Sequence, residues 1–485
     1  MALTQVKTGA LADDAVTEDK IANAINTARA ANTAKDLTAL SASNLTSGTV
    51  PDARFPATLP AASAANLTAV PAANITGTLP AISGANLTSL PAANITGTLP
   101  AISAANLTNV PAANITGTLP AISGANLTNL PASGKATNLV INGAMNVAQR
   151  GTSSTSSGYQ TLDRYKAEGG NTGQTVTQSR QDLSSSDTPY SLGFRKYMRI
   201  ALASAGTASA NTGVEIQQRI EAQNIATSGW NYTSASSNIS LQFWFRCSTN
   251  QTFYAYLYSF DGTAQVYTFS FTASGNNTWT KITKTIPGNS NLTFNTDTGP
   301  GLQLKLIAFY GTDYSNNKTL DQWAAYDGAN QLPDMASTWL TTGTPTFDVT
   351  GIQLEVGDTA SDFAHESYAE TLQKCLRYYE LIIQGNTKTI GTGFAYSSNE
   401  VNIGVKTHVP MRSAPSLNQT SGADYFFLGG GGDSNARIDG NWLIYGETDN
   451  LALLYATPDA SITAGAGKYI RTDNANARLA FSAEL

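Results

Sequence analysis

Small apolar side chains return at a fixed interval through residues 57–131, and polar or proline positions separate them. The stretch follows a twenty-residue repeat of the form N-L-T-x-[VL]-P-A-A-N-I-T-G-T-L-P-A-I-S-[GA]-A. Because proline closes each half of the repeat, a continuous helix cannot run through it. The pattern therefore predicts extended strand and turn, with too few apolar side chains per half-repeat to bury within one chain.

Repeats that cannot cover their own apolar positions must stack or associate. We expect three chains wound around one axis with a shared core, and a single-chain solenoid is the alternative. A disordered linker would fit the Ala, Thr, Asn and Pro content, but the return of Leu and Ile to the same phase argues against it. The predicted core positions of this shaft are Leu67, Ile75, Leu79, Leu87, Leu99 and Leu119.

A short helix is predicted over residues 17–34, upstream of the repeat. Glu18 and Asp19 suit a first helical turn, where negative charge is favourable. Ile21 and Ile25 fall on one face and form a narrow stripe, sufficient for a seam between three helices. An isolated surface helix is the alternative interpretation.

From Thr137 onward, charged and aromatic residues return and short strand-like runs follow one another. The runs are rich in β-branched and aromatic residues, and Gly and Pro turn signals separate them. This spacing predicts a two-sheet β-sandwich of jelly-roll type. The predicted strands are Ile239–Cys247, Thr252–Phe260, Gln265–Ala273, Trp279–Ile286, Leu302–Phe309 and Phe347–Val356.

After the sandwich, Glu366–Leu381 is predicted to be a helix that links two modules, and a smaller β-domain follows it. The pattern thus predicts a mainly β, elongated trimeric fibre with four segments: an attachment segment with a short helix (1–36), the repeat shaft (37–134), the sandwich (135–364) and the helix with a C-terminal tip domain (365–485). The predicted tip strands are Thr389–Tyr396, Glu400–Val409, Ala423–Leu428, Trp442–Tyr445, Leu451–Tyr455 and Tyr469–Arg471.

Composition argues against several kinds of ligand and site. Charged residues make up 13% of the 485-residue chain and the formal net charge is −6, which argues against a general polyanion-binding surface and so against nucleic acid. Cys247 and Cys375 give neither a disulfide framework nor a zinc spacing. His365 and His408 are the only histidines, too few for a histidine metal cluster. We predict no cofactor and no metal.

Membrane insertion and secretion through a signal peptide are not expected. No apolar run approaches the roughly twenty residues that span a bilayer. The first residues, M-A-L-T-Q-V-K-T-G-A-L, lack the long apolar core of a signal peptide. We therefore expect synthesis in a cytoplasm.

Aromatic residues in polar loops are the best candidates for ligand binding, because flat apolar rings stack on sugars while neighbouring Asn, Asp and Gln bond the hydroxyl groups. Two clusters qualify, and position at the tip favours the second. For any single residue of either cluster, ordinary sandwich core is the favoured interpretation. The first cluster is Tyr310, Tyr314, Trp323 and Tyr326, and the second is Tyr425, Phe426, Phe427, Trp442 and Tyr445 with Asp439.

Several segments of the chain resemble tail fibres of tailed bacteriophages. The most specific is the 351–380 stretch, which opens I-Q-L-E-V-G after Gly351 and closes with a C-L-R-Y-Y-E helix end. The others are A-L-T-Q-V-K-T-G-A-L-A-D-D-A-V-T-E-D-K-I-A at 2–22, S-G-T-V-P-D-A-R-F-P at 47–56, N-L-V-I-N-G-A-M-N-V-A-Q-R-G-T-S at 138–153, V-P-M-R-S-A-P at 409–415 and the final A-E-L.

The resemblance implies a virion component that is a homotrimer. Its N-terminus would dock to a phage tail or adaptor protein, and its distal β-domains would bind a bacterial surface, usually a polysaccharide. One alternative is a structural appendage whose distal domains bind another virion protein. A polysaccharide-degrading spike is the lesser alternative, since it needs paired carboxylates and no pair stands out among the 34 acidic residues. We therefore predict a binding protein and not an enzyme.

Overall fold

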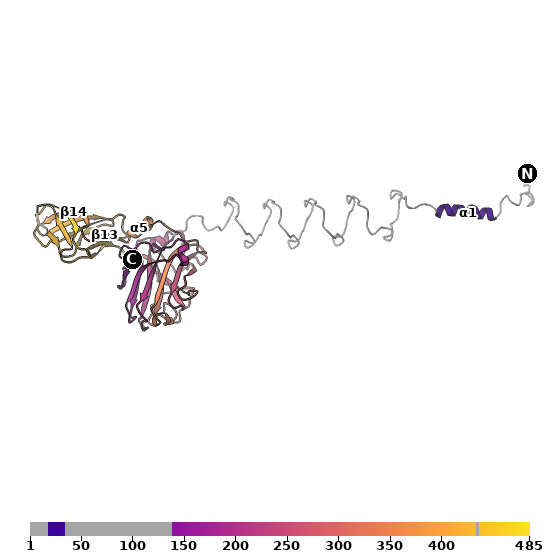
Figure 1. Cartoon of the computed structure of the whole chain (residues 1–485), viewed down its shortest axis with the longest axis horizontal. Coiled ribbons are helices and arrows are strands. Elements are labelled where there is room, and N and C mark those ends of the chain that lie inside the picture. The colour runs from indigo at the N-terminus through magenta and orange to yellow at the C-terminus, as the bar shows by residue number, and fades with distance from the viewer. Residues whose placement is uncertain (1–17, 34–137, 433–435) are drawn as a thin grey trace, which may run out of the picture. The chain divides into compact units, whose positions relative to one another are not determined.

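The computed structural model describes residues 18–33, 138–432 and 436–485, which belong to two compact units, Met1–Pro120 and Ala121–Leu485 (Figure 1). In the first unit the predicted helix is confirmed as α1 (Glu18–Thr33). Ile25 on this helix is 60% exposed. The side chain of Ile21 lies outside the described residues. The same holds for the predicted shaft positions Leu67, Ile75, Leu79, Leu87, Leu99 and Leu119.

The second unit begins with a sandwich of two six-stranded antiparallel sheets, coloured magenta to orange in Figure 1. The strand order is β1-β3-β4-β12-β6-β9 in the first sheet and β11-β8-β7-β10-β5-β2 in the second. The first sheet comprises β1 (Ser153–Ser154), β3 (Val176–Asp182), β4 (Lys196–Leu202), β12 (Thr346–Val356), β6 (Asn238–Cys247) and β9 (Thr280–Pro287). The second comprises β11 (Trp323–Ala325), β8 (Gln265–Phe271), β7 (Phe253–Ser259), β10 (Pro300–Tyr310), β5 (Gly213–Glu221) and β2 (Lys166–Gly170).

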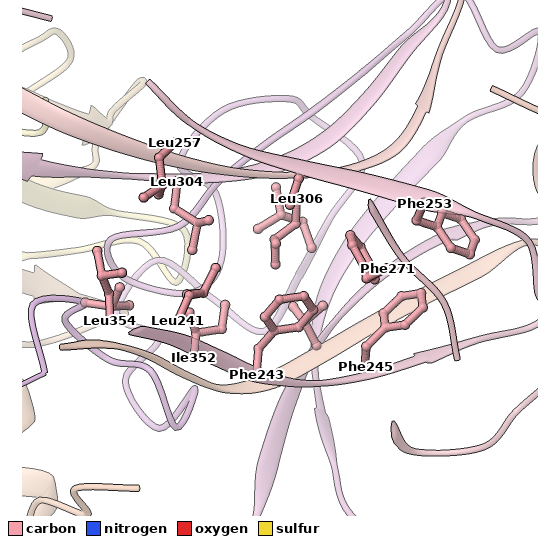
Figure 2. Close-up of a cluster of buried hydrophobic side chains, with 14 of the residues drawn as sticks. Leu241, Phe243, Phe245, Phe253, Leu257, Phe271, Leu304, Leu306, Ile352 and Leu354 are labelled. Carbon is pink, nitrogen blue, oxygen red and sulfur yellow. The ribbon is translucent and has the colours of Figure 1, made fainter. Parts of the chain in front are cut away.

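Aromatic and aliphatic side chains from the two sheets meet in one core. Figure 2 shows Phe243 and Phe245 of β6 directed into the space between the sheets, with Phe243 below Leu306 of β10 and Phe245 beside Phe253 of β7. Phe271 of β8 packs edge-on against Phe243 and Phe245, with ring centroids 5.2 and 5.0 Å apart. Alternate residues of each strand thus enter the core.

All six strands predicted for the sandwich are present, each within two residues of its expected bounds at either end. Helix is confined to single turns in the connections: α2 (Thr188–Ser191), α3 (Ala222–Ala226) and α4 (Thr338–Thr341). Among the described residues, no helix combines the length and the apolar character that crossing a membrane requires.

The linking helix is shorter than predicted. α5 runs over Tyr368–Leu376 and begins with a capping box, in which the Ser367 side chain and the Glu370 side chain each bond the other residue's backbone N–H. The prediction of a helix continuing to Leu381 is wrong, because Tyr379 already starts strand β13 (Tyr379–Gln384).

A second core lies in the C-terminal part, drawn in orange and yellow in Figure 1. It has a three-stranded sheet, order β13-β22-β16, and a seven-stranded sheet, order β18-β17-β21-β14-β15-β20-β19. The six strands predicted for the tip correspond to β14, β15, β17, β19, β20 and β21. The bounds are β14 (Thr389–Ser397), β15 (Glu400–Lys406), β16 (Ser416–Thr420), β17 (Phe426–Gly429), β18 (Ala436–Ile438), β19 (Leu443–Glu447), β20 (Leu451–Ala456), β21 (Gly467–Thr472) and β22 (Arg478–Ser482).

The last residues of the chain return to the sandwich. Glu484 is paired with Arg150 at 3.0 Å and with Arg164. The Arg164 guanidinium also lies 3.4 Å from the centre of the Tyr378 ring. Burial raises the pKa of Asp163, which faces Arg150, to about 6. These contacts fasten the chain end into a largely buried ionic cluster.

A second set of contacts between the sandwich and the C-terminal part centres on Glu221 at the end of β5. We call this set the fastening. The Glu221 carboxylate accepts two hydrogen bonds from Arg377, at 2.8 and 2.9 Å, and one from the Tyr378 hydroxyl. Burial acts to raise the pKa of Glu221, but these hydrogen bonds outweigh it and the net pKa is lowered. Arg377 and Tyr378 belong to the C-L-R-Y-Y-E motif, so this motif joins the sandwich to the segment that follows it.

Candidate ligand-binding face

The seven-stranded sheet has one buried and one open face. Period-2 alternation places Phe426 and Leu428 of β17, and Ile470 of β21, in the core of this part of the chain. The residues between them point away from that core. We call the side formed by these outward residues on β14, β15, β17, β19, β20 and β21 the outer sheet face.

A cross-strand row runs over the centre of the outer sheet face. Phe394 on β14 is paired with Asn402 on β15, Asn402 with Tyr455 on β20, and Tyr455 with Leu443 on β19. Phe394 and Leu443 are exposed, Tyr455 is half-buried, and Asn402 is buried between its neighbours. The row therefore consists of three largely apolar side chains and one amide group, which lies between Phe394 and Tyr455.

Two tyrosines beside this row each occupy a β-bulge. Ala395 pairs with Val401 and Ser397 with Glu400, which leaves Tyr396 as the extra residue of β14. Tyr445 is likewise the extra residue between Ile444 and Gly446 on β19. Bulges re-aim side chains, and these two are among the most exposed aromatic residues described, at 66% for Tyr396 and 73% for Tyr445. The Tyr445 ring lies 6.1 Å from that of Tyr455.

The other end of the outer sheet face is more compact. Tyr469 of β21 is opposite Gly429 of β17, and a Cβ at Gly429 would come within 2.1 Å of the Tyr469 ring, so only glycine leaves room for it. The same ring lies 5.9 Å from Phe427, and the Arg471 guanidinium lies 4.5 Å from the centre of the Phe427 ring. A half-exposed aromatic pair with a bordering cation results.

The strand register separates the residues of the predicted tip cluster into buried and exposed ones. Phe426 and Trp442 are fully buried and pack edge-on against each other at 5.8 Å. They are core residues, because alternation turns them inward, and the expectation that they form an exposed surface is wrong. Phe427 lies on the outer face but is mostly covered, and Tyr425 is half-buried. Tyr445 is exposed, and for it the binding role stays a prediction.

Asp439 is exposed and lies in a group of three carboxylates. Asp424, Asp439 and Asp459 place one oxygen each within 4.8 Å of one another. Backbone N–H groups already use two of them: Asp439 accepts from Asp424 at 2.7 Å and Asp459 from Arg437 at 2.7 Å. The cluster is thus accounted for by turn structure.

The predicted sandwich cluster is also divided. Tyr310 is buried against Tyr314, with ring centroids 4.9 Å apart. Trp323 is largely buried, donates from Nε1 to the Pro287 carbonyl at 2.7 Å, and contacts Tyr267. Exposure was expected for both Tyr310 and Trp323, and that expectation is wrong. Tyr326 is 39% exposed and packs edge-on against Tyr258 at 4.8 Å.

The outer side of the second sandwich sheet is not a bare apolar surface: part of it is a second buried cluster that includes Val266, Ile307 and Leu332, and polar side chains lie beside that cluster. Gln217 of β5, Lys305 of β10 and Tyr256 of β7 form one cross-strand row. Lys305 pairs with Glu215 at 2.7 Å, and burial raises the pKa of that carboxyl. The Tyr256 hydroxyl bonds Gln331 at 2.8 Å. Most of this row is satisfied within the chain.

Two pairs of carboxylates are close together in the sequence, Asp321 with Asp327 and Glu355 with Asp358, and they are engaged in local contacts. Asp321 pairs with Lys284 at 2.5 Å. Glu355 accepts from the Ser361 backbone at 2.6 Å, and Asp358 accepts from Asn238 at 2.7 Å. Asp327 accepts from the Ala329 backbone N–H at 3.0 Å, so each of these four carboxylates has a structural partner.

Sequence reasoning missed Phe394, Tyr396, Tyr469, Leu443 and Leu451, which are all exposed on the seven-stranded sheet. The spacing of Phe394 and Tyr396 around Ala395 was a possible signal. Which of the alternating residues points outward depends on pairing register and on the two bulges, and a single sequence shows neither.

No family model and no curated protein matches the chain. Among solved structures, the enzymatically active domain of tailspike protein 4 from bacteriophage CBA120 is 10% identical, with 45% of this chain and 21% of that chain covered and a TM-score of 0.24. This chain therefore spans about a fifth of that protein. TmCBM61, solved with β-1,4-galactotriose, is 8% identical, with 46% and 100% covered and a TM-score of 0.23. A family 11 carbohydrate-binding module from Clostridium thermocellum is 10% identical, with 42% and 95% covered and a TM-score of 0.22.

Proposed function

We propose that this chain is a bacteriophage tail fibre and that its outer sheet face binds a polysaccharide of the host surface. The single observation that carries the binding proposal is the set of aromatic rings on that face. Tyr396 and Tyr445 are held out by bulges, and Phe394 and Tyr469 are also exposed. Tyrosine offers a flat apolar ring and a hydroxyl group, which suits the alternating faces and edges of sugars.

The phage context is supported by the sequence resemblance. In this proposal three copies assemble, the N-terminal segment attaches to a tail or adaptor protein, and the protein acts in the virion. Binding proceeds without cleavage, since the carboxylates that were candidates for a catalytic pair serve local structure.

A second use of the same face is contact with another protein, either a second copy or another virion component. Leu443 and Leu451 favour it, because both are exposed aliphatic side chains on adjacent strands, and leucine has no flat ring to stack on a sugar. Under this alternative the fibre would be a structural appendage.

The test is binding of the full chain to intact cells of a panel of bacterial strains. We expect saturable binding to a few strains, which disappears when surface polysaccharide is stripped, and no release of reducing sugar. Binding to no strain by a folded protein would favour the structural appendage. Released oligosaccharide would make the protein an enzyme and contradict the proposal.

A further inference from the structure

Among the residues that the structure describes, Arg219 on β5 has no polar partner for its side chain. Across residues 138–432 and 436–485, it is the one arginine for which the structure gives neither a side-chain hydrogen bond nor an ion pair. The side chain is half-buried, and its Nε is fully covered without an acceptor. Arginine is normally found paired in such surroundings, because a partly desolvated charge without a partner is costly.

The surroundings of Arg219 are aromatic. Its guanidinium carbon lies 5.2 Å from the centre of the Phe260 ring. Phe260 packs edge-on against Tyr258 at 4.7 Å, and Tyr258 against Tyr326 at 4.8 Å. Tyr326 is exposed, while Tyr258 and Phe260 are half-buried, so this row of rings reaches solvent.

An amide side chain adjoins the row. Gln303 of β10 is paired in register with Arg219 on one side and Tyr258 on the other, so all three point to the outer side of the second sandwich sheet. Gln303 donates to the Gln217 side chain, which fixes the orientation of its amide. One cation, one oriented and largely buried amide and a row of rings therefore lie together near one end of the adjacent strands β5, β10 and β7.

We propose that Arg219, Gln303 and the ring row of Tyr258, Phe260 and Tyr326 bind a sugar residue that carries a carboxylate, such as a uronate or a sialate. The guanidinium presents donors in the fork geometry that a carboxylate accepts from with two parallel hydrogen bonds. The rings supply a stacking surface for the sugar ring.

The acidic sugar is an isolated residue in an otherwise neutral chain. With a net charge of −6 the protein repels a uniformly charged polyanion, whereas a single arginine needs only one carboxylate. This site lies on the sandwich and does not depend on the outer sheet face, so either can exist without the other.

The test is ligand-observed saturation-transfer NMR on the full chain with monosaccharides. The probes are glucuronate, galacturonate and N-acetylneuraminate, with glucose and galactose as neutral counterparts. We expect saturation transfer to at least one acidic sugar and none to its neutral counterpart. Arg219→Gln should abolish it, and Arg219→Lys should weaken it, because lysine keeps the charge but loses the fork.

Lys281→Gln is the matched control, since Lys281 is exposed on β9 of the other sheet and its loss changes the net charge equally. It should bind as the native chain does. If Arg219→Gln fails to fold by circular dichroism, Tyr326→Ala, at an exposed ring, should still reduce saturation transfer. No signal from any of the three acidic sugars, or an equal signal in a folded Arg219→Gln variant, would overturn the proposal.

Discussion

At the scale of single residues, burial separates the aromatic side chains that stabilise the fold from those available to a ligand. Trp442 and Tyr445 are three positions apart, yet Trp442 is fully buried beside Phe426 and Tyr445 projects from a bulge. Both were predicted as receptor contacts from one local cluster. Their residue types are alike, and only the strand register distinguishes them.

Trp442→Ala should destabilise the C-terminal part of the chain by about 3–5 kcal/mol, because it removes a large buried ring and leaves a cavity. Tyr445→Ala should change the free energy of unfolding by no more than about 0.5 kcal/mol. Urea unfolding followed by circular dichroism measures both. Equal losses in the two variants would show that Tyr445 is also part of the core.

At the scale of elements, the strands were predictable and the ends of helix α5 were not. β6, β7 and β10 have strong β-branched and aromatic content between clear turn signals, and their local preference agrees with their place in the sheets. Tyr378 and Tyr379 fit a helical stripe equally well in sequence. They leave the helix because Tyr378 bonds Glu221 and Tyr379 pairs with Ser482, contacts over 100 residues away along the chain.

The outer sheet face, our proposed binding face, likewise depends partly on local sequence and partly on contacts between distant residues. Sequence located the aromatic residues of the tip, but the outer sheet face also depends on two bulges and on a space left by Gly429. These are properties of pairing between strands. Of the six residues predicted for the tip, Phe426 and Trp442 therefore lie on the buried side of the sheet, and a receptor-binding role for the others stays a prediction.

Glu221→Gln should loosen the fastening between β5 and the helix end. It removes the charge that Arg377 and Tyr378 share, at a side chain that is fully buried, and we expect a loss of about 1–3 kcal/mol. Glu366→Gln is the control, since its pair with Lys374 is partly exposed and should contribute less than about 1 kcal/mol. The midpoint of urea unfolding and the rate of protease cleavage within residues 357–367 measure the effect. Cleavage that is no faster in Glu221→Gln than in the control would mean that the fastening does not hold the two parts together.

At the scale of the whole molecule, four of the segments that carry the resemblance meet at the contacts between the sandwich and the C-terminal residues. Arg150, Arg377 and Glu484 come from three of those segments. A fourth contributes Arg412, which donates to the carbonyls of Ala483 and Glu484. These parts of the resemblance therefore lie in residues that join the sandwich to the C-terminal part, and the proposed receptor face is made of other residues.

Assembly of three chains through the repeat remains a prediction, since Leu79, Leu99 and Leu119 lie outside the described residues. Replacing all three with Asp should abolish the trimer, because each buried leucine contributes about 1.5 kcal/mol or more and a charge in the shared core is costly. Replacing the neighbouring Thr78, Thr98 and Thr118 with Asp adds the same charge at polar positions and should leave the trimer intact. Light scattering measures the mass of each variant in solution and so shows which of them still forms a trimer. A stable trimer of the leucine variant would rule out the shared core.

The most direct test of the central claim is cell binding by the full chain with Tyr396→Ala and Tyr445→Ala combined, on a strain that the native chain binds. Loss of two stacking rings should raise the dissociation constant about tenfold or more. Tyr368→Ala, at a tyrosine on α5 that is 57% exposed and lies outside the outer sheet face, should bind like the native chain. An unchanged dissociation constant for the folded double variant would contradict the assignment of the outer sheet face as the receptor-binding surface.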